Sequence, residues 1–274
     1  MRSTNLLAVL VVSLTTSTAF AVEIIAHRGA SHDAPENTLA AFRLGWEQQA
    51  DTNELDVQQS QDGRAIVIHD NSTRRTAGLD KLVAEQSLAE LQKLDGGEWK
   101  AERWRGEKIP TLEEAIATLP ATGKRLFIEI KCSAAVLPEV ERVIAAAKKQ
   151  PAQLAIIGFN YETMRLAKER FPNLQVYWIV SYKAAKETGQ LPQLDDLVKK
   201  AKAAKLDGLD LDWKFPLDRA AVDSIKQAGL KLYCWTVNDL KVARRLADAG
   251  IDGITTDRPL WLREGLHADR DSAQ

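Results

Sequence analysis

The sequence predicts an α/β fold of the (β/α)8 barrel type (a TIM barrel). Short apolar runs recur along the chain, and amphipathic segments with helix start and stop signals separate them. No glycine-rich nucleotide loop, which would favour an open doubly wound sheet, follows the first run. The expected strands are Glu23–His27, Asn53–Val57, Leu126–Lys131, Leu154–Phe159, Val176–Val180, Gly208–Asp212, Lys231–Val237 and Gly253–Asp257.

Capping motifs mark the helix ends between these strands. Segments Ser87–Glu90 and Thr111–Glu114 have the capping-box pattern, in which two side chains satisfy backbone N–H groups of the first turn. Asn160 and Asn238 are expected to cap the helices that follow them. Gly250 stands where a helix should end, because glycine readily adopts the left-handed conformation of a C-terminal cap.

The first residues have the features of a secretory signal peptide. Arg2 precedes the apolar stretch Leu6–Leu14, and residues 19–21 have the small-x-small form of a cleavage site. The stretch is too short to span a membrane. We therefore expect removal of residues 1–21, a secreted or periplasmic location, and no stable membrane anchor afterwards. Residues 22–262 should form one domain, and residues 263–274 a polar tail.

Charge and cysteine content narrow the function classes. The formal net charge is −1, which argues against nucleic acid as a partner. Cys132 and Cys234 are too few for a disulfide framework. They fall at strands on opposite sides of the expected barrel, farther apart than the roughly 7 Å that a disulfide allows between Cα atoms. We expect both to remain free.

One segment interrupts the alternation of strands and helices. Asp62-Gly63 lies between the expected second strand and another strand-like run, Ala65–His69, which is the pattern of a β-hairpin. With a two-residue loop, Asp56 would lie opposite His69, with Cβ atoms about 4.5–5.5 Å apart. A short insertion, about residues 71–108, follows. Its two tryptophans, Trp99 and Trp104, are suited either to the wall of a substrate site or to a small loop core.

Acidic side chains gather at the C-terminal ends of the expected strands, where barrel enzymes carry their active sites. Glu54 and Asp56 stand two apart and therefore share one face of a strand, while Glu129 lies near the end of the next barrel strand. Three carboxylates at one mouth repel each other unless a cation lies between them. Because hard oxygen ligands favour Ca²⁺ or Mg²⁺ over Zn²⁺, the sequence predicts a divalent cation site.

Two histidines and two cationic side chains are expected at the same mouth. His27 ends the first strand and His69 ends the hairpin, and imidazoles of near-neutral pKa suit general acid–base catalysis. Arg28 and Lys131 are suited to bind an anion, arginine by a two-pronged contact and lysine as a point charge. Together with a hard cation, these groups suggest phosphoryl transfer at a phosphodiester.

Short motifs occur in a distinctive order along nearly the whole chain. They are HRG at 27–29, PENT at 35–38, ELDV at 54–57, DG at 62–63, HD at 69–70, IPTLEE at 109–114, IEIK at 128–131, FN at 159–160, WTVN at 235–238 and DGITTDRP at 252–259. This combination resembles the glycerophosphodiester phosphodiesterase family in its compact bacterial form. The Ser31–Asp33 segment departs from it, since the family often carries a glycine there.

The resemblance implies a metal-dependent barrel enzyme that cleaves a small-molecule glycerophosphodiester to sn-glycerol 3-phosphate and an alcohol. The residues it implies are His27 and His69 for acid–base catalysis, Glu54, Asp56 and Glu129 for the metal, and Arg28, Lys131, Phe159 and Trp235 for the substrate. His69 is the favoured acid of the first step. The alcohol, the choice between Ca²⁺ and Mg²⁺, a cyclic intermediate or direct water attack, and the oligomeric state stay open.

The alternative functions require different residues at the C-terminal mouth of the expected barrel. A lysophospholipase D or sphingomyelinase-like phosphodiesterase would use the same chemistry on another substrate. A glycosidase would use Glu54 and Glu129 as acid and nucleophile and would need neither a metal nor the histidines. A non-catalytic protein that binds phosphodiesters would keep the cationic clamp but would not need every predicted catalytic position to be filled, as it is here.

Overall fold

The computed structural model describes residues 22–271 except residue 187. The expected signal peptide, residues 1–21, lies outside the described residues and stays a prediction. Within the described part, no helix combines the length and apolar character needed to cross a membrane.

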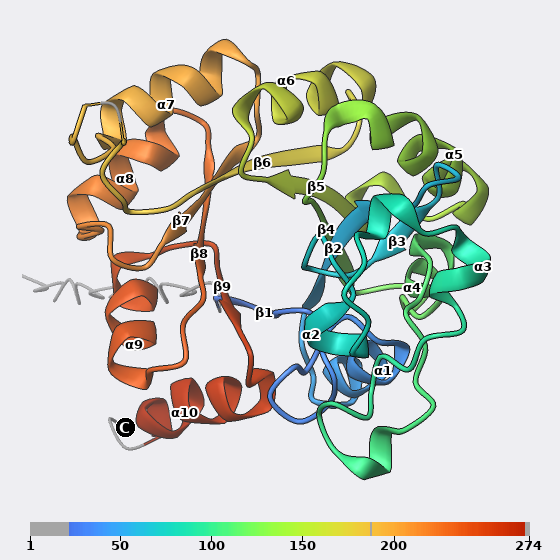
Figure 1. Ribbon diagram of the computed structural model, residues 1–274. Helices are drawn as coiled ribbons and strands as arrows, with labels where there is room; N and C mark the ends of the chain where they lie inside the picture. Colours follow the sequence, from blue (N-terminus) through green and yellow to red (C-terminus); the bar gives the residue numbers. More distant parts are fainter. Residues whose placement is uncertain (1–21, 187, 272–274) are drawn as a thin grey trace, which may run out of the picture.

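A closed barrel of eight parallel strands forms the centre of the described chain, and one additional strand joins its rim (Figure 1). The order β1-β9-β8-β7-β6-β5-β4-β2 closes on itself because β1 also pairs with β2. This confirms the predicted fold class and all eight expected strands. The strands are β1 (Glu23–Ala26), β2 (Thr52–Gln59), β3 (Ala65–Val67), β4 (Arg125–Ile130), β5 (Leu154–Gly158), β6 (Gln175–Val180), β7 (Gly208–Asp212), β8 (Lys231–Trp235) and β9 (Gly253–Thr256).

Helices surround the barrel and bury their apolar faces against the outer side of its strands (Figure 1). They are α1 (Leu39–Glu47), α2 (Arg74–Ala77), α3 (Leu88–Leu91), α4 (Leu112–Ala117), α5 (Leu137–Ala147), α6 (Tyr161–Arg170), α7 (Leu194–Ala203), α8 (Arg219–Gln227), α9 (Leu240–Ala249) and α10 (Pro259–Asp271). Short 3₁₀ turns cover Val83–Glu85, Glu102–Trp104, Ala134–Val136 and Pro151–Gln153. Residues 263–271, expected as part of a polar tail, continue α10.

The structure confirms both capping boxes, the Asn160 cap of α6 and the left-handed Gly250 at the end of α9. The expected cap at Asn238 is wrong. Asp239 caps α9 instead, because its side chain accepts hydrogen bonds from the first-turn N–H groups. The neighbouring asparagine turns toward the barrel mouth, where its amide donates to Asp257.

Aromatic side chains close the lower half of the barrel interior. The Phe127, Tyr177 and Tyr233 rings pack with centroid distances of 4.8 to 5.5 Å. Below them, the Arg125 guanidinium lies 2.9 Å from a Glu23 carboxylate oxygen. The rings and the ion pair below them fill this end of the barrel, and the candidate site residues gather at the opposite, C-terminal end of the strands. Cys132 and Cys234 are both free, as expected.

The hairpin forms between β2 and β3, but the predicted register is wrong by one residue. Val57 pairs with Val67, so Asp56 lies opposite Ile68 rather than His69. The loop has three residues instead of two, since the Ser60 N–H donates to the Arg64 carbonyl and Gly63 takes a φ of 78°. Three-residue loops of this kind add a bulge residue, which shifts the pairing. His69 lies just beyond β3.

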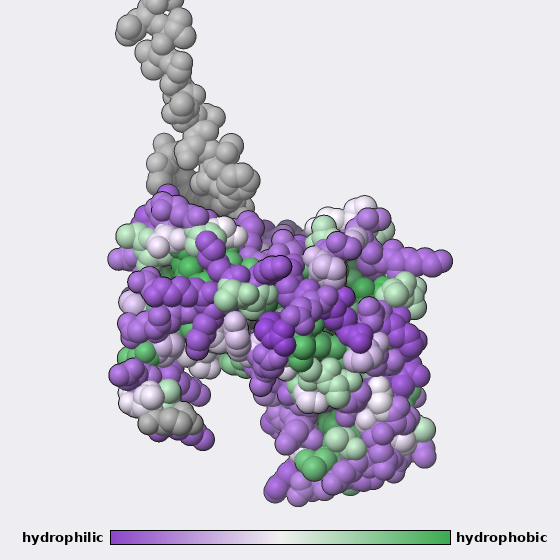
Figure 2. All heavy atoms as spheres, turned by 90° about the horizontal axis from the view of Figure 1, so that it is seen from above, coloured by the Kyte–Doolittle hydropathy of each residue, from purple (hydrophilic) through white to green (hydrophobic). Residues whose placement is uncertain are grey.

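The insertion is compact and packs on the hairpin. It includes α2, α3 and two 3₁₀ turns, and a small core of Ile66, Ile68, Val83, Leu91 and Ile109 joins it to β3 and to the segment before α4. Figure 2, seen from above the view of Figure 1, shows two arms with a deep hollow between them. Hydrophilic residues cover most of this face, and hydrophobic residues form separate patches.

Gly29, directly after the first strand's His27-Arg28, should tolerate no side chain. Its φ is 78°, and a Cβ built on it would lie 2.5 Å from the backbone carbon of Ala41. Gly29→Ala should therefore lower the free energy of unfolding by about 3 kcal/mol, from left-handed strain plus overpacking. Gly123 is the matched control, with a φ of 73° and no atom within 4 Å of an added Cβ.

Urea unfolding of the two alanine variants checks this expectation. Gly123→Ala should lose only about 1–2 kcal/mol, the cost of the left-handed conformation alone. Equal losses in both variants would contradict the close approach of this turn to α1.

Candidate active site

Three buried carboxylates meet at the upper end of the barrel. Asp56 on β2 stands in register with Glu129 on β4, and Glu54 lies one side-chain layer below Asp56. One oxygen from each of the three lies within 4.8 Å of the others, and their side chains are buried. The structure therefore brings together the three predicted metal ligands.

Burial at close quarters shifts the pKa values of these carboxyl groups. Burial, followed by repulsion from Asp56, raises the pKa of Glu129 to about 7 and raises that of Glu54 well above its usual range. Burial also acts on Asp56, but Arg28 and Lys131 outweigh it and lower the pKa of Asp56. Two of the three groups thus resist ionisation unless positive charge is supplied.

The same cluster has free oxygen ligands. Glu54 Oε1 and Asp56 Oδ1 are buried and have no hydrogen-bond partner. Three clustered carboxylates, two of which have an unpartnered oxygen, match the ligands of a hard divalent cation, whose bonds of about 2.0–2.6 Å accommodate oxygens at this separation. The residues present therefore fit a bound divalent metal.

Both predicted anion-binding cations lie against the cluster. Arg28 has a φ of 56°, and its backbone N–H donates to Glu54 Oε2 at 2.8 Å. Its guanidinium Nε lies 3.1 Å from Asp56 Oδ2. The Lys131 ammonium lies 2.8 Å from Glu129 Oε1 and 3.7 Å from Asp56 Oδ1. These two side chains supply positive charge at the position where a phosphate would meet the acidic cluster.

His27 has a carboxylate partner, Asp257, directly after the C-terminal end of β9. Its Nδ1 lies 2.7 Å from Asp257 Oδ1, which leaves Nε2 for chemistry. Asp257 also accepts hydrogen bonds from the Ser31 hydroxyl at 3.1 Å and the Asn238 amide at 2.6 Å. Burial alone would raise its pKa, but these donors and His27 lower the pKa of Asp257 to about 2. An ionised carboxylate therefore fixes and supports this imidazole.

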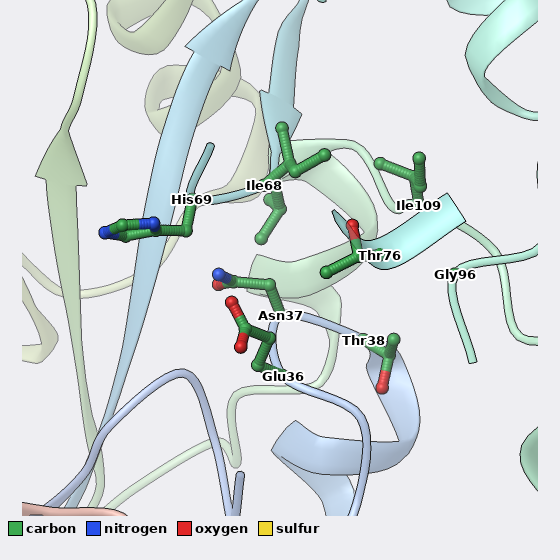
Figure 3. A pocket seen from close by; sticks show the side chains of 9 residues that line it. Glu36, Asn37, Thr38, Ile68, His69, Thr76, Gly96 and Ile109 are labelled. Atoms are coloured by element: carbon green, nitrogen blue, oxygen red, sulfur yellow. The ribbon is translucent and has the colours of Figure 1, made fainter. Parts of the chain in front are cut away.

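His69 has an equivalent partner next to it in the sequence. Its Nδ1 lies 2.7 Å from Asp70 Oδ1. Figure 3 shows its ring extending away from Ile68 and Ile109, with the side chains of Glu36 and Asn37 nearby. Burial is the largest influence on His69 and lowers its pKa, which favours the neutral imidazole.

Two aromatic side chains form a wall beside the cations. The Phe159 and Trp235 rings pack edge to face with centroids 5.2 Å apart. The Lys131 ammonium lies 5.2 Å from the Phe159 ring centroid. The Trp235 indole N–H donates to the Asp210 carbonyl at 3.2 Å, which fixes its orientation. Both residues lie where the sequence predicted substrate contacts.

Comparison with known proteins gives this site a family. The model of the glycerophosphoryl diester phosphodiesterase family matches residues 27–260, which include every predicted site residue. The chain belongs to this family. Family membership establishes an enzyme that acts on phosphoric diesters, and it decides against the glycosidase and the non-catalytic binding protein.

Individual relatives agree with the family. A glycerophosphodiester phosphodiesterase from Caldanaerobacter subterraneus subsp. tengcongensis is 34% identical over 243 residues, which cover 87% of this chain and 95% of the relative. The structure of an Oleispira antarctica phosphodiesterase in complex with the product sn-glycerol 3-phosphate is 32% identical, with a TM-score of 0.80. That alignment covers 91% of this chain and 98% of the other. A Silicibacter pomeroyi structure at 22% identity, also with a TM-score of 0.80, shares the fold over 90% of this chain and 94% of its own.

Several residues of the candidate active site of this phosphodiesterase were not predicted from its sequence. Asn37 orients Asp56 of the acidic cluster, because its amide donates to Asp56 Oδ2 at 2.8 Å and its Oδ1 accepts from the Asp56 N–H at 3.1 Å. Its place in the PENT motif was the available signal. Asp70 directly follows His69, and Asp257 ends the last strand, so both were visible as strand-end acids. No sequence feature pointed to Arg75, which lies inside the insertion.

Metal affinity of this phosphodiesterase should rise with pH. Glu129, with a pKa of about 7 in the metal-free protein, must lose its proton to act as a ligand. Below that pH each further unit should weaken Ca²⁺ or Mg²⁺ binding by about tenfold per released proton. Titration calorimetry at a series of pH values, in buffers of different ionisation enthalpy, measures both affinity and protons released.

Glu129→Gln is the matched variant for this titration. It should bind the cations more weakly and lose the part of the pH dependence near neutrality. An affinity that stays constant as the pH falls from about 8 to about 6 would contradict ligation by this carboxylate.

Proposed function

We propose that this phosphodiesterase hydrolyses glycerophosphodiesters to sn-glycerol 3-phosphate and an alcohol, with a divalent cation held by Glu54, Asp56 and Glu129. The observation that carries the proposal is the joint presence, at one barrel mouth, of two carboxylate-paired histidines and a buried acidic cluster with two unpartnered oxygens. The sn-glycerol 3-phosphate in the Oleispira antarctica structure supports the product. The signal pattern of residues 1–21 supports a secreted or periplasmic place of action, which we propose with it.

The cation we propose is Ca²⁺ or Mg²⁺, since all three ligands are hard oxygens. When bound, it neutralises charge on a nonbridging phosphate oxygen and on the surrounding carboxylates. Arg28 and Lys131 then bind the other phosphate oxygens, as their present carboxylate contacts are weakened by the added positive charge. The Phe159 and Trp235 wall contacts the carbon skeleton of the substrate and excludes water from that side.

The carboxylate partners of the two histidines differ, which supports different roles for His27 and His69. Besides His27, the side chains that donate to Asp257 are the neutral Ser31 and Asn238, so its negative charge is not shared with an arginine or lysine. Asp70 shares its charge with the Arg75 guanidinium, at 2.7 Å, and supports a protonated His69 less well. We therefore propose His27 as the acid that protonates the leaving alkoxide and His69 as the base. This reverses the preference drawn from the sequence alone.

A substrate panel with and without chelator tests the function. Glycerophosphocholine, glycerophosphoethanolamine, glycerophosphoglycerol and one lysophospholipid should be compared. Release of sn-glycerol 3-phosphate is measured for the glycerophosphodiesters, and release of lysophosphatidic acid for the lysophospholipid. We expect turnover of the glycerophosphodiesters, its loss in EDTA, and recovery with Ca²⁺ or Mg²⁺. Preferred turnover of the lysophospholipid would instead identify a lysophospholipase D, and full activity after exhaustive chelation would remove the metal role.

Single histidine variants test the acid–base assignment. His27→Ala and His69→Ala should each lose about 10²- to 10⁴-fold in kcat on glycerophosphocholine, the usual contribution of a general acid or base. A p-nitrophenyl phosphodiester has a leaving group that needs no acid. On it His27→Ala should recover most activity and His69→Ala should not. The opposite pattern would exchange the roles, and His32→Ala, at an exposed histidine, is the control.

A further inference from the structure

The guanidinium of Arg75, which lies outside the predicted site, hydrogen-bonds to two carboxylates that border the site. Arg75, on α2 of the insertion, donates from Nε to Asp70 Oδ2 at 2.7 Å and from Nη2 to Asp70 Oδ1 at 3.2 Å. It also donates from Nη1 to Glu36 Oε2 at 2.8 Å and from Nη2 to Glu36 Oε1 at 2.7 Å. Each carboxylate is therefore held by two donors at once.

Each of the two carboxylates also contacts a residue that has a proposed role in the reaction. Asp70 Oδ1 is the partner of His69 Nδ1, and Glu36 Oε1 accepts from Arg28 Nη1 at 2.9 Å. A continuous chain of charged hydrogen bonds thus runs from His69 through Asp70, Arg75 and Glu36 to Arg28. Its two ends are the proposed base and one of the proposed phosphate ligands.

The geometry requires a guanidinium at this position. Only a planar fork with several N–H groups can make two-pronged contacts to two carboxylates together, whereas a lysine ammonium acts as a single point charge. The alternative is that Arg75 only attaches the insertion to the barrel. The small core of the insertion already does so, and ion pairs as exposed as this one, at 41% for the arginine side chain, contribute little to stability.

We propose that Arg75 is a positioning residue, which sets the orientation of His69 through Asp70 and that of Arg28 through Glu36 without touching the substrate. The inference rests on the proposed function for the roles of these two ends. It extends the catalytic apparatus into the insertion, so that α2 carries a residue on which turnover depends.

The neighbouring Arg74 provides a matched control. It has the same charge on the same helix turn, but its side chain is 74% exposed and its nearest carboxylate oxygen, on Asp80, lies 3.6 Å away. Arg75→Ala should lose about 10- to 100-fold in kcat on glycerophosphocholine, as removal of a residue that orients a ligand or catalytic group does. Arg74→Ala should keep wild-type turnover, and both variants should keep the wild-type Tm.

Chemical rescue of the Arg75→Ala variant distinguishes a positioning role of this arginine from a role in attaching the insertion to the barrel. Guanidinium chloride at low millimolar concentration should restore part of the activity of Arg75→Ala, ammonium chloride should not, and Arg75→Lys should remain impaired. In a double-mutant cycle, Asp70→Asn should remove the part of the Arg75→Ala effect that acts on His69, because Arg75 reaches His69 through Asp70. Wild-type kcat in Arg75→Ala, or a loss that appears only together with a lower Tm, would overturn the proposal.

A readout without substrate separates this inference from the proposed function. Nitrogen NMR of the full chain labelled in its histidines reports the imidazole tautomer and hydrogen bonding. Arg75→Ala should change the His69 signals and leave those of His27 unchanged, even if the wild type fails to turn over every glycerophosphodiester in the panel. Unchanged His69 signals would contradict the inference whatever the substrate proves to be.

Discussion

The mutual repulsion of three buried carboxylates is the constraint on which the site depends. Glu54, Asp56 and Glu129 lie at one barrel mouth with little access to water, so their charge must be compensated within the structure. Arg28 and Lys131 supply part of the compensation, and the raised pKa of Glu129 shows that it is incomplete. The divalent cation that we propose for this site would complete the compensation and give the three carboxylates a common function.

The rest of the fold holds these charged groups close together and fills the barrel interior below them. The aromatic floor of Phe127, Tyr177 and Tyr233 fills the barrel below the cluster, so the three carboxylates can be reached only from the C-terminal mouth above it. The turn after β1 places the Arg28 N–H on Glu54, and it depends on the close approach of Gly29 to α1. From the other side, Lys100 of the insertion donates to the Ser31 carbonyl at 2.8 Å, which connects the insertion to the loop that follows His27.

Much of this arrangement could be predicted because it follows from local patterns. Periodicity gave the eight barrel strands, and the spacing of two between Glu54 and Asp56 placed both carboxylates on the inner face. The hairpin register could not be obtained in the same way, since Asp-Gly fits both two- and three-residue loops and only the Ser60–Arg64 closure decides between them. Asn238 and Asp239 are both good caps, and the choice depends on Asp257, which is distant in the sequence. Arg75 could not be predicted from the sequence because its two carboxylate partners, Glu36 and Asp70, come from separate segments.

We propose that the three carboxylates share one divalent cation and that Arg28 and Lys131 then turn to the phosphate. A crystal structure with Ca²⁺ and sn-glycerol 3-phosphate tests it most directly. We predict one ion bound by oxygens of Glu54, Asp56 and Glu129 at about 2.3–2.6 Å, with Lys131 moved from Glu129 to a phosphate oxygen. An ion bound elsewhere, or a phosphate contacted by neither Lys131 nor Arg28, would contradict the account.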